Sequence, residues 1–497
     1  MNMGQVILVG AGPGDPGLIT VKGRQAIQSA EVVVYDRLVS QAILDLIPEH
    51  AERINVGKAS SHHLVPQEQI NQILLEQALL GKKVVRLKGG DPFLFGRGGE
   101  ELELLAQHGV PFQEVPGITS AIAVPAYSGI PVTHRDFCSS LHVITGHQRA
   151  GKPLNIPFDA LVKTGGTLVF LMGVTALPNI CKGLLEAGMD ADMPAAVLEK
   201  GTTPAQRPIL ATLAKLPDTA KAEQVKSPAI IIVGKVCTLS PQFDWFDKLP
   251  LKGKRVVVTR PKERAGTISD RLRALGAEVT ELPCIQTVPY VPCPQMESAI
   301  SNIDTYEWLA FTSPAGVSAL MDLLDTSGRD VRALGRIRLA AIGPGTDREL
   351  RKHGLRADLI PSVYDGEHLG QALCAIKPAG KVLILRAQWG TPALTEALDD
   401  GNIMYDDIRC YQTQYTCPNV EEVRGLLTEE HAPIVTFTSA STVKGFVSAL
   451  GDMDDSHIIA ACIGKQTEAE AKKHGLHTIT AKEATIDALI ACIMAEG

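Results

Sequence analysis

The stretch Val84-Val85-Arg86-Leu87-Lys88-Gly89-Gly90-Asp91-Pro92-Phe93-Leu94-Phe95-Gly96-Arg97-Gly98-Gly99-Glu100-Glu101 carries the clearest structural signal in this chain. Its valine-rich start predicts a β-strand, and Gly89-Gly90-Asp91-Pro92 predicts where that strand ends. The loop that follows mixes glycines with aromatic rings and with the cation Arg97. Glycine lets the backbone approach a ligand closely. The stretch therefore predicts a ligand-binding loop at a strand end, with an ordinary surface turn as the alternative.

Apolar runs of strand length alternate with helical patterns along the whole chain. This alternation predicts an α/β fold with largely parallel sheets. The clearest interruption lies at residues 240–250, between an apolar run that closes one series and a fresh first strand. Because 497 residues exceed what one core usually supports, we expect modules at 1–245 and 253–497, joined by a linker at 246–252.

The second module repeats its own motifs. Phe311-Thr312-Ser313-Pro314 returns as Phe437-Thr438-Ser439-Ala440, and Lys352-His353-Gly354-Leu355 returns as Lys473-His474-Gly475-Leu476. The two copies are too far apart for a solenoid, whose repeats are short. The repeat therefore predicts two duplicated α/β domains.

Two proline-containing passages suggest how these domains are connected. One passage runs through Pro289, Pro292 and Pro294, and the other reaches Pro418. Paired crossovers at these points predict a discontinuous domain, 253–287 plus 413–497, that encloses a second domain at 288–412. A simple tandem of two domains is the alternative.

Composition excludes several classes of protein. The formal charge of −7 argues against general nucleic-acid binding. The apolar runs are shorter than the ~20 residues that cross a bilayer, and no basic segment precedes the first run, so we expect neither a membrane span nor a signal peptide. The ten cysteines are scattered singly, which argues against disulfide frameworks and favours a reducing cytoplasm. The adjacent histidines His62 and His63 could suggest a metal site, but the sequence offers no third ligand beside them. We therefore expect no metal site.

The first strand leads into Gly10-Ala11-Gly12-Pro13-Gly14-Asp15, which departs from a dinucleotide-binding fingerprint. Asp15 stands where the fingerprint needs its third glycine, and Pro13 has no amide hydrogen to donate. Asp36 has the spacing of a ribose-binding acid. With the fingerprint broken, Asp36 needs another role.

The same loop belongs to an ordered set of motifs. The set comprises residues 10–16, 35–39, 56–58, 89–93, 115–121, 129–135, 145–147, 172–173, 199–202 and 227–229. Together these motifs resemble the uroporphyrinogen-III C-methyltransferase family over residues 1–245. The resemblance implies a two-lobed tetrapyrrole methylase fold with a trough between the lobes, and a homodimer formed through this half. It also implies transfer of methyl groups from S-adenosylmethionine to rings A and B of uroporphyrinogen III, which gives precorrin-2.

The resemblance also assigns residues to roles. Adenosylmethionine would lie against Pro13, Gly89, Gly90, Asp91, Leu94, Thr119, Ser120, Met172 and Gly201. Asp36 would accept a proton and Lys58 would donate one. The alternatives are that Asp36 caps the following helix and that Lys58 is a solvated surface charge. The polycarboxylate substrate would be met by Arg37, Arg97, His134 and Arg135, although His134 and Arg135 could equally form a buried structural pair.

Motifs of the second module resemble the uroporphyrinogen-III synthase family over residues 251–497. They are Val258-Thr259-Arg260-Pro261, Tyr411-Gln412-Thr413 and residues 311–314, 341–346 and 437–441. The resemblance implies a duplicated two-domain α/β synthase with an interdomain cleft. In that cleft hydroxymethylbilane would close to uroporphyrinogen III, with ring D inverted and no cofactor.

By this second resemblance Tyr411 matches the candidate proton donor. Thr312, Ser313, Ser439 and Ser441 would bind carboxylate arms of the substrate, with helix N-capping as the alternative reading. Arg260 and Lys465 are further candidates for carboxylate binding.

The sequence therefore supports the hypothesis of a bifunctional enzyme whose partners are small tetrapyrroles. It would make uroporphyrinogen III and then precorrin-2, for siroheme or cobalamin synthesis. Two alternatives stay open. The second half could be a non-catalytic tetrapyrrole-binding module, or the first half could methylate another corrin-pathway intermediate.

Overall fold

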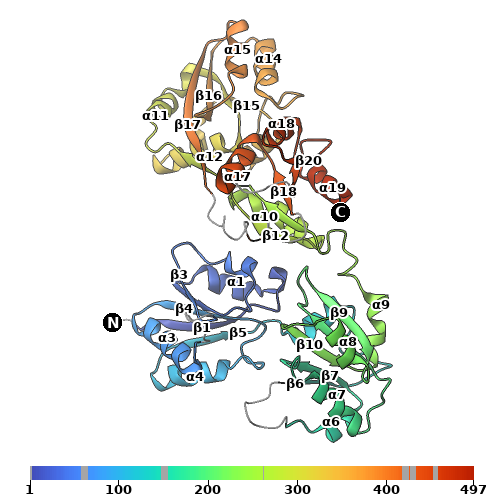
Figure 1. Cartoon of the computed structure of the whole chain (residues 1–497). Helices are drawn as coiled ribbons and strands as arrows, with labels where there is room; N and C mark the ends of the chain where they lie inside the picture. The colour runs from blue at the N-terminus through green and yellow to red at the C-terminus, as the bar shows by residue number, and fades with distance from the viewer. Residues whose placement is uncertain are drawn as a thin grey trace. The chain divides into compact units, whose positions relative to one another are not determined.

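The computed structural model describes residues 3–57, 65–146, 155–260, 262–416, 425, 433–451 and 457–496, without the side chains of 262–266. The chain divides into two compact units (Figure 1). The first comprises Met1–Val256 with Asp270–Thr280, and the second comprises Val257–Ser269 with Glu281–Glu496.

The first sheet has the strand order β3-β2-β4-β1-β5, and its paired strands are parallel. Its strands are β1 (Gln5–Gly10), β2 (Val32–Tyr35), β3 (Glu52–Asn55), β4 (Lys83–Lys88) and β5 (Phe112–Val115). The helices around it are α1 (Val21–Gln28), α2 (Gln41–Leu44), α3 (Gln67–Leu79) and α4 (Gly98–Gln107). Alternate residues of β1 face opposite layers: Val9 packs with Ile27 of α1, and Leu8 packs with Leu74 of α3. Burial on both faces explains the nearly continuous apolar strands.

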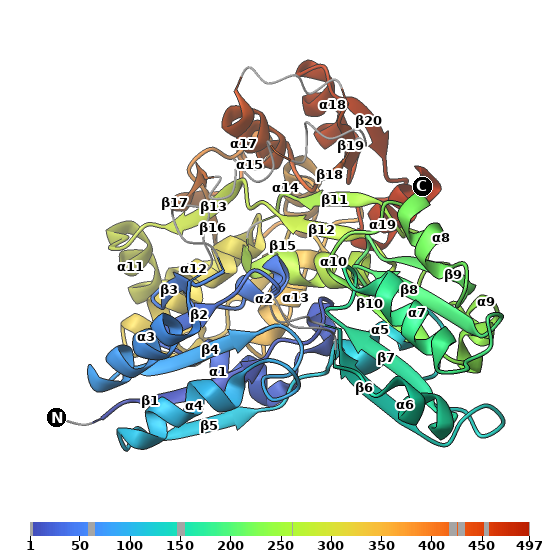
Figure 2. The same cartoon turned by 60° about the horizontal axis from the view of Figure 1, so that its bottom comes forward.

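The second sheet has the order β6-β7-β10-β8-β9. Its strands are β6 (Leu141–Thr145), β7 (Thr167–Leu171), β8 (Pro194–Glu199), β9 (Arg207–Thr212) and β10 (Ala229–Val233). Its helices are α5 (Ser120–Tyr127), α6 (Phe158–Thr164), α7 (Leu177–Glu186), α8 (Leu216–Ala222) and α9 (Ser240–Phe243). Ile180 of α7 packs on Phe170 and Ile231, and α7 lies over this sheet in both views (Figure 1 and Figure 2).

The second sheet is mixed, which differs from the largely parallel sheets expected from the sequence. β10 runs antiparallel to β7 and to β8, and β8 runs antiparallel to β9. The connection from β8 to β9 spans only residues 200–206, and so short a link can join only antiparallel neighbours. The α/β architecture itself is confirmed.

The described residues between 255 and 480 form two more sheets, with the orders β12-β11-β18-β19-β20 and β13-β17-β16-β14-β15. The third sheet contains β11 (Arg255–Val258), β12 (Glu278–Glu281), β18 (Ile434–Phe437), β19 (Ile459–Cys462) and β20 (His477–Thr480). The fourth contains β13 (Ile285–Pro289), β14 (Tyr306–Phe311), β15 (Arg338–Ala341), β16 (Lys381–Ala387) and β17 (Tyr405–Tyr415). The chain thus leaves the third sheet, builds the fourth, and returns. This order supports the discontinuous arrangement, whose domain boundaries stay a prediction.

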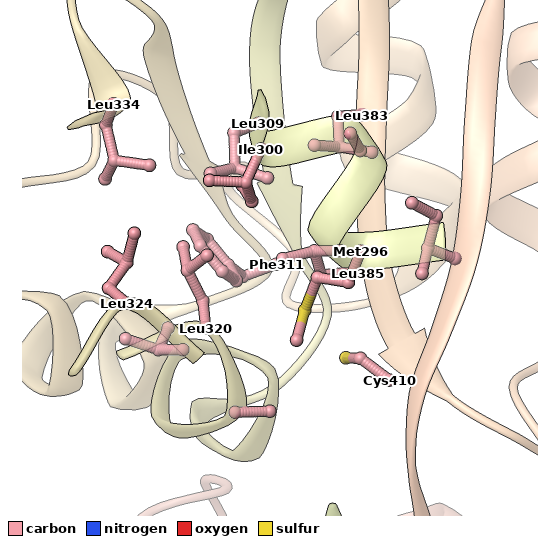
Figure 3. Packing of buried hydrophobic residues seen from close by; sticks show 14 of the residues in the cluster. Met296, Ile300, Leu309, Phe311, Leu320, Leu324, Leu334, Leu383, Leu385 and Cys410 are labelled. Carbon is pink, nitrogen blue, oxygen red and sulfur yellow. The ribbon is translucent and has the colours of Figure 1, made fainter. Parts of the chain in front are cut away.

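The fourth sheet carries apolar layers on both faces. The helices of this region are α10 (Lys262–Ala274), α11 (Pro294–Ser301), α12 (Pro314–Thr326), α13 (Pro344–Lys352), α14 (Gly366–Ile376), α15 (Ala393–Asp400), α17 (Ala440–Leu450), α18 (Lys465–Lys473) and α19 (Ile486–Glu496). Figure 3 shows Met296 and Leu320, from α11 and α12, packed with Phe311 and Leu385 of the strands. Ile384, the neighbour of Leu385, packs in the opposite layer with α14 and α15.

Within the described ranges, none of the helices combines the length and the apolar character that a bilayer crossing requires. The segment expected as a linker packs on the first unit: Phe246 lies 4.9 Å from Tyr127 between ring centroids, and Leu251 is fully buried. Lys252 Nζ donates to Gln206 O at 2.9 Å.

Candidate functional site

Three loops of the first sheet meet where its parallel strands end. Gly12 and Gly90 exchange backbone hydrogen bonds, of 3.2 Å from Gly12 N and 2.8 Å from Gly90 N. A Cβ on Gly117 would overlap Gly90 O and the backbone of Gly10. Side chains are therefore excluded here because the loops themselves pack backbone against backbone.

Gly90 and Asp91 serve these contacts in different ways. Gly90 has a φ of +69°, and no described atom lies within 4 Å of where its Cβ would stand. Asp91 accepts hydrogen bonds from Phe93 N (2.9 Å), Leu94 N (3.0 Å) and Gly117 N (3.1 Å). The Asp91 carboxylate thus holds two loops together, while Gly90 leaves open space on its own side.

The first loop is also tied to the second sheet through Asp15. Tyr127 donates its hydroxyl to Asp15 Oδ2 at 2.6 Å, and Asp15 N donates to Thr202 Oγ1 at 3.3 Å. Gln206 completes the network, because it accepts from Thr202 N (2.8 Å) and donates to Tyr127 O (3.1 Å). Burial, and then the hydrogen bond to Asp15, raises the pKa of Tyr127. Asp15, which broke the dinucleotide fingerprint, therefore joins the two lobes.

Several predicted cofactor residues lie at ends of elements. Thr119 caps α5 by accepting from Ala121 N at 3.3 Å, and Ser120 is the first residue of that helix. Met172, just after β7, has a φ of +54° and is 52% exposed. A methionine is rarely held in this left-handed region, which is a feature of functional sites. Gly201 packs so closely on Val124 that a Cβ would overlap it.

Asp36 contacts a group of buried charges on the first sheet, which we call the buried charge group: Arg86, Lys88 and Glu101. Arg86 Nη2 lies 3.5 Å from Asp36 Oδ2, and Arg86 Nε lies 3.1 Å from Glu101 Oε1. Lys88 Nζ lies 2.8 Å from the same Glu101 oxygen. The three members are between 0% and 5% exposed. Burial, and then repulsion from Arg86, lowers the pKa of Lys88.

The carboxylate of Asp36 is more accessible than this group, since its side chain is 26% exposed. Its Oδ1 accepts from Leu38 N at 3.1 Å. The helix-capping alternative for Asp36 is wrong, because α2 begins after its N-cap residue Ser40. Lys58, the predicted proton donor, lies outside the described residues.

The predicted substrate cations lie on three loops, and Arg37 lies on the loop that follows β2. Arg97, in the loop after β4, already pairs with Glu100 through distances of 2.9 and 2.6 Å. His134 and Arg135 lie between α5 and β6, where the His134 ring stacks on Phe137 at 4.8 Å. Arg135 and Arg37 are exposed, so a buried His134–Arg135 pair is wrong.

The repeated motifs of the second module take the same form in both sheets. Ser313 follows β14 and caps α12 by accepting from Gly316 N at 3.3 Å. Ser439 follows β18 and caps α17 by accepting from Thr442 N at 3.3 Å. Both serines therefore cap helices, a role that is compatible with anion binding at the start of a helix. Ser441 lies in the first turn of α17, and Thr312 directly precedes Ser313.

Tyr411 lies on β17 and is 6% exposed. Its hydroxyl is 2.6 Å from Ser313 Oγ, so the structure brings together two residues that the sequence singled out separately. Arg260 lies just after β11, and Lys465 begins α18 with an exposed side chain.

Sequence reasoning missed the buried charge group, and it missed Tyr127 and Gln206 of the network around Asp15. Arg86 and Lys88 are part of an alternating strand, and Glu101 is part of an ordinary helical pattern. Tyr127 and Gln206 lie outside the quoted motifs. Among the described residues, histidine, cysteine, aspartate and glutamate form no group of three that could hold a metal ion.

Two family models match the chain in succession. The model described as Tetrapyrrole (Corrin/Porphyrin) Methylases matches residues 5–217, and the model described as Uroporphyrinogen-III synthase HemD matches residues 266–491.

Similar proteins carry related names. The chain is 48% identical to the porphyrin biosynthesis protein HemD of Ruminiclostridium josui, across 99% of this chain and 97% of that protein. It is 55% identical to the siroheme synthase of Enterobacter sp. (strain 638), across 49% of this chain and 53% of that protein, so it spans about half of this relative. A solved uroporphyrin-III C-methyl transferase from Thermus thermophilus, complexed with S-adenyl homocysteine, has 41% identity and a TM-score of 0.41. That match covers 47% of this chain and 99% of the solved one.

Proposed function

The chain belongs to the porphyrin biosynthesis protein HemD family, as a tetrapyrrole methylase region fused to a uroporphyrinogen-III synthase region, and on this premise we propose that it catalyses two consecutive reactions. The second region cyclises hydroxymethylbilane to uroporphyrinogen III with inversion of ring D. The first region methylates that product twice to precorrin-2, which feeds siroheme or cobalamin synthesis. One observation carries the proposal: both regions lie on a chain that matches a porphyrin biosynthesis protein along nearly its whole length.

In the first region, S-adenosylmethionine would supply an electrophilic methyl group when bound. The residues fit such a ligand. Gly90 leaves open space beside backbone carbonyls, and exposed Met172 offers an apolar surface held in a fixed backbone conformation. Pro13, Gly89, Asp91, Leu94, Thr119, Ser120 and Gly201 complete the proposed binding set.

Asp36 accepts the proton that the macrocycle loses after methylation, with Lys58 as the proposed proton donor. Its carboxylate is partly exposed, so a substrate can reach it, while buried Arg86 fixes one of its oxygens from behind. A carboxylate held in one orientation beside the substrate is suited to accept a proton from it. Arg37, Arg97, His134 and Arg135 bind the carboxylate arms of uroporphyrinogen III.

In the second region, Ser313 and Tyr411 act as a hydroxyl pair. The hydroxymethyl oxygen of the substrate leaves as water and needs a proton, which the pair donates. Strand-end hydroxyls and helix N-termini at Thr312, Ser439 and Ser441 bind propionate and acetate arms, because free amides at a helix start favour anions. Arg260 and Lys465 add positive charge to this binding.

Separate assays of the two reactions test the proposal. Hydroxymethylbilane alone should yield uroporphyrinogen III rather than isomer I, which forms spontaneously. Uroporphyrinogen III with S-adenosylmethionine should yield precorrin-2, and heat-inactivated protein is the control for both assays. Isomer I alone in the first assay would remove the synthase assignment, and unmethylated substrate in the second would remove the methyltransferase assignment.

A methyltransferase fused to a non-catalytic tetrapyrrole-binding module is the second candidate. The burial of Tyr411 favours it, because a proton donor that is 6% exposed has little access to substrate. This candidate predicts methylation of supplied uroporphyrinogen III without any isomer III from hydroxymethylbilane. The same two assays therefore distinguish the candidates. We also propose a homodimer through the methyltransferase half, which sedimentation of the purified chain tests.

A further inference from the structure

Trp389 is the most exposed large hydrophobic residue among those that the structure describes, at 84%. It lies in the loop that follows β16. Leaving a whole indole in water forgoes the free energy that its burial would contribute. Tryptophan is enriched at binding surfaces, where its ring supplies a large contact area.

The loop that carries Trp389 is firmly held by a buried arginine. Arg386 is 3% exposed, and it donates to both carboxylate oxygens of Asp407 at 2.7 and 2.5 Å. Its Nη1 donates to Thr391 O at 2.8 Å. Arg409 Nη1 donates to Ala387 O at 3.2 Å. The backbone is thus tied on both sides of Trp389, so its exposure is a feature of a built loop.

This loop lies where the parallel strands of the fourth sheet end. Ala387 pairs with Tyr411 in the sheet, and Gln388 N donates to Tyr411 O at 2.8 Å. The hydroxyl of Tyr411 in turn contacts Ser313 at the end of β14. In open α/β sheets, ligands bind beyond the carboxyl ends of the strands. Trp389 therefore shares an edge with the proposed Ser313–Tyr411 hydroxyl pair.

The charges beside the loop favour an anionic aromatic ligand. Arg386 and Arg409 both pair with the single carboxylate of Asp407, so this trio carries one excess positive charge. The Arg409 side chain is 36% exposed. An aromatic face next to a guanidinium matches a pyrrole ring that bears carboxylate arms.

We propose that the Trp389 indole stacks on a pyrrole ring of the linear tetrapyrrole and positions it for cyclisation at the Ser313–Tyr411 edge. This inference rests on the proposed synthase function. It assigns Trp389 a positioning role in binding, with no part in proton transfer. Loss of the ring should therefore weaken substrate binding and leave the chemical step largely intact.

Steady-state cyclisation of hydroxymethylbilane by full-length Trp389→Ala and Trp389→Phe tests the proposal. We expect Trp389→Ala to raise KM about tenfold, in the range measured for aromatic stacking platforms, with kcat changed less than about threefold. Trp389→Phe keeps a stacking face and should stay within about threefold of the wild-type KM. Met404→Ala is the matched control: Met404 is 67% exposed and precedes β17, at the opposite edge of the same sheet, so its KM should be unchanged.

Tryptophan fluorescence gives a second readout that a merely structural role would not move. Uroporphyrinogen III added anaerobically should quench the tryptophan emission of the wild-type chain. The quenching that arises from Trp389 should be absent in Trp389→Phe and should remain in Trp245→Phe. An unchanged KM in Trp389→Ala, or a loss confined to kcat, overturns the inference. If the wild-type chain forms no uroporphyrinogen III at all, the synthase proposal fails first and this inference falls with it.

Discussion

Asp36 combines an accessible carboxylate with a buried support. Its side chain is 26% exposed, whereas Arg86 behind it is 3% exposed and is also bound to Glu101. Burying charges costs free energy unless they are paired, so a buried pair must have good geometry to persist. In this chain the buried pair lies next to Asp36, the proposed proton acceptor. A fixed orientation of the carboxylate matters most at that position.

Replacement of this carboxylate is the first prediction. Asp36→Asn keeps the size of the side chain but cannot accept a proton, so methyl transfer should fall by about 10²–10⁴-fold. Binding of S-adenosylhomocysteine, measured by calorimetry, should stay near the wild-type value. Asp192→Asn, at an exposed acid of the other lobe, is the control. Wild-type turnover in Asp36→Asn would show that another group takes the proton.

Lys88 makes the stability of the chain depend on pH. Its pKa in the folded protein lies below the ordinary 10.5, first because of burial and then because of Arg86. Between the two pKa values the unfolded chain binds one proton more than the folded chain at this group. The free energy of unfolding therefore rises with pH in that window.

Comparison with Lys88→Met isolates this effect. The difference in unfolding free energy, wild type minus Lys88→Met, should grow as the pH rises from neutral toward 10.5. Urea unfolding at several pH values measures it. A difference that stays constant or shrinks over that range would contradict the lowered pKa.

At the residue scale, the sequence singled out residues that stand in motifs but missed a buried residue outside them. Asp36, Ser313 and Tyr411 were singled out from motifs, and the structure places the last two in contact. Glu101 was not singled out, because a buried glutamate and a solvated one look alike in a helical pattern. Only the fold brings it to Arg86 and Lys88.

At the scale of elements, glycines serve two distinct purposes in the first unit. Gly117 lets three loops pack together, since a Cβ there would overlap Gly90 O. Gly99 is the second residue of α4 and has no described atom within 4 Å of the place where its Cβ would stand. The two positions should therefore respond oppositely to the same substitution.

Alanine at each position tests this contrast. Gly117→Ala should lower the thermal midpoint, because backbone at Gly10 and Gly90 cannot move aside cheaply. Gly99→Ala should leave the thermal midpoint unchanged or raise it. Alanine is the better helix former, and the gain in the free energy of unfolding should be at most about 1 kcal/mol. Differential scanning calorimetry measures both. If both substitutions lowered the thermal midpoint equally, the contact with Gly90 would not be the cause of the lower midpoint in Gly117→Ala.

The course of the strands was only partly predictable from the sequence. Strand positions and the α/β class follow from apolar runs that alternate with helical patterns. The direction of β10 does not follow, because its two neighbours lie far away in the sequence and pair with it only in the folded sheet. The role of Asp15 was hidden for the same reason, since its partner Tyr127 is 112 residues away.

At the scale of the whole molecule, two family regions follow one another on a single chain. Residues 5–217 match the methylase model and residues 266–491 match the synthase model. The proposed product of the second region is the proposed substrate of the first. This relation is what makes the fusion informative, because either region alone would be compatible with several pathways.

The most direct test of the central claim is a single incubation of the pure full-length chain with hydroxymethylbilane and S-adenosylmethionine, analysed for tetrapyrrole isomer and for methyl groups. We predict precorrin-2 that carries two methyl groups from the donor and has the type III arrangement of side chains. Without S-adenosylmethionine, the reaction should stop at uroporphyrinogen III. Accumulation of only uroporphyrinogen I, methylated or not, would contradict the account.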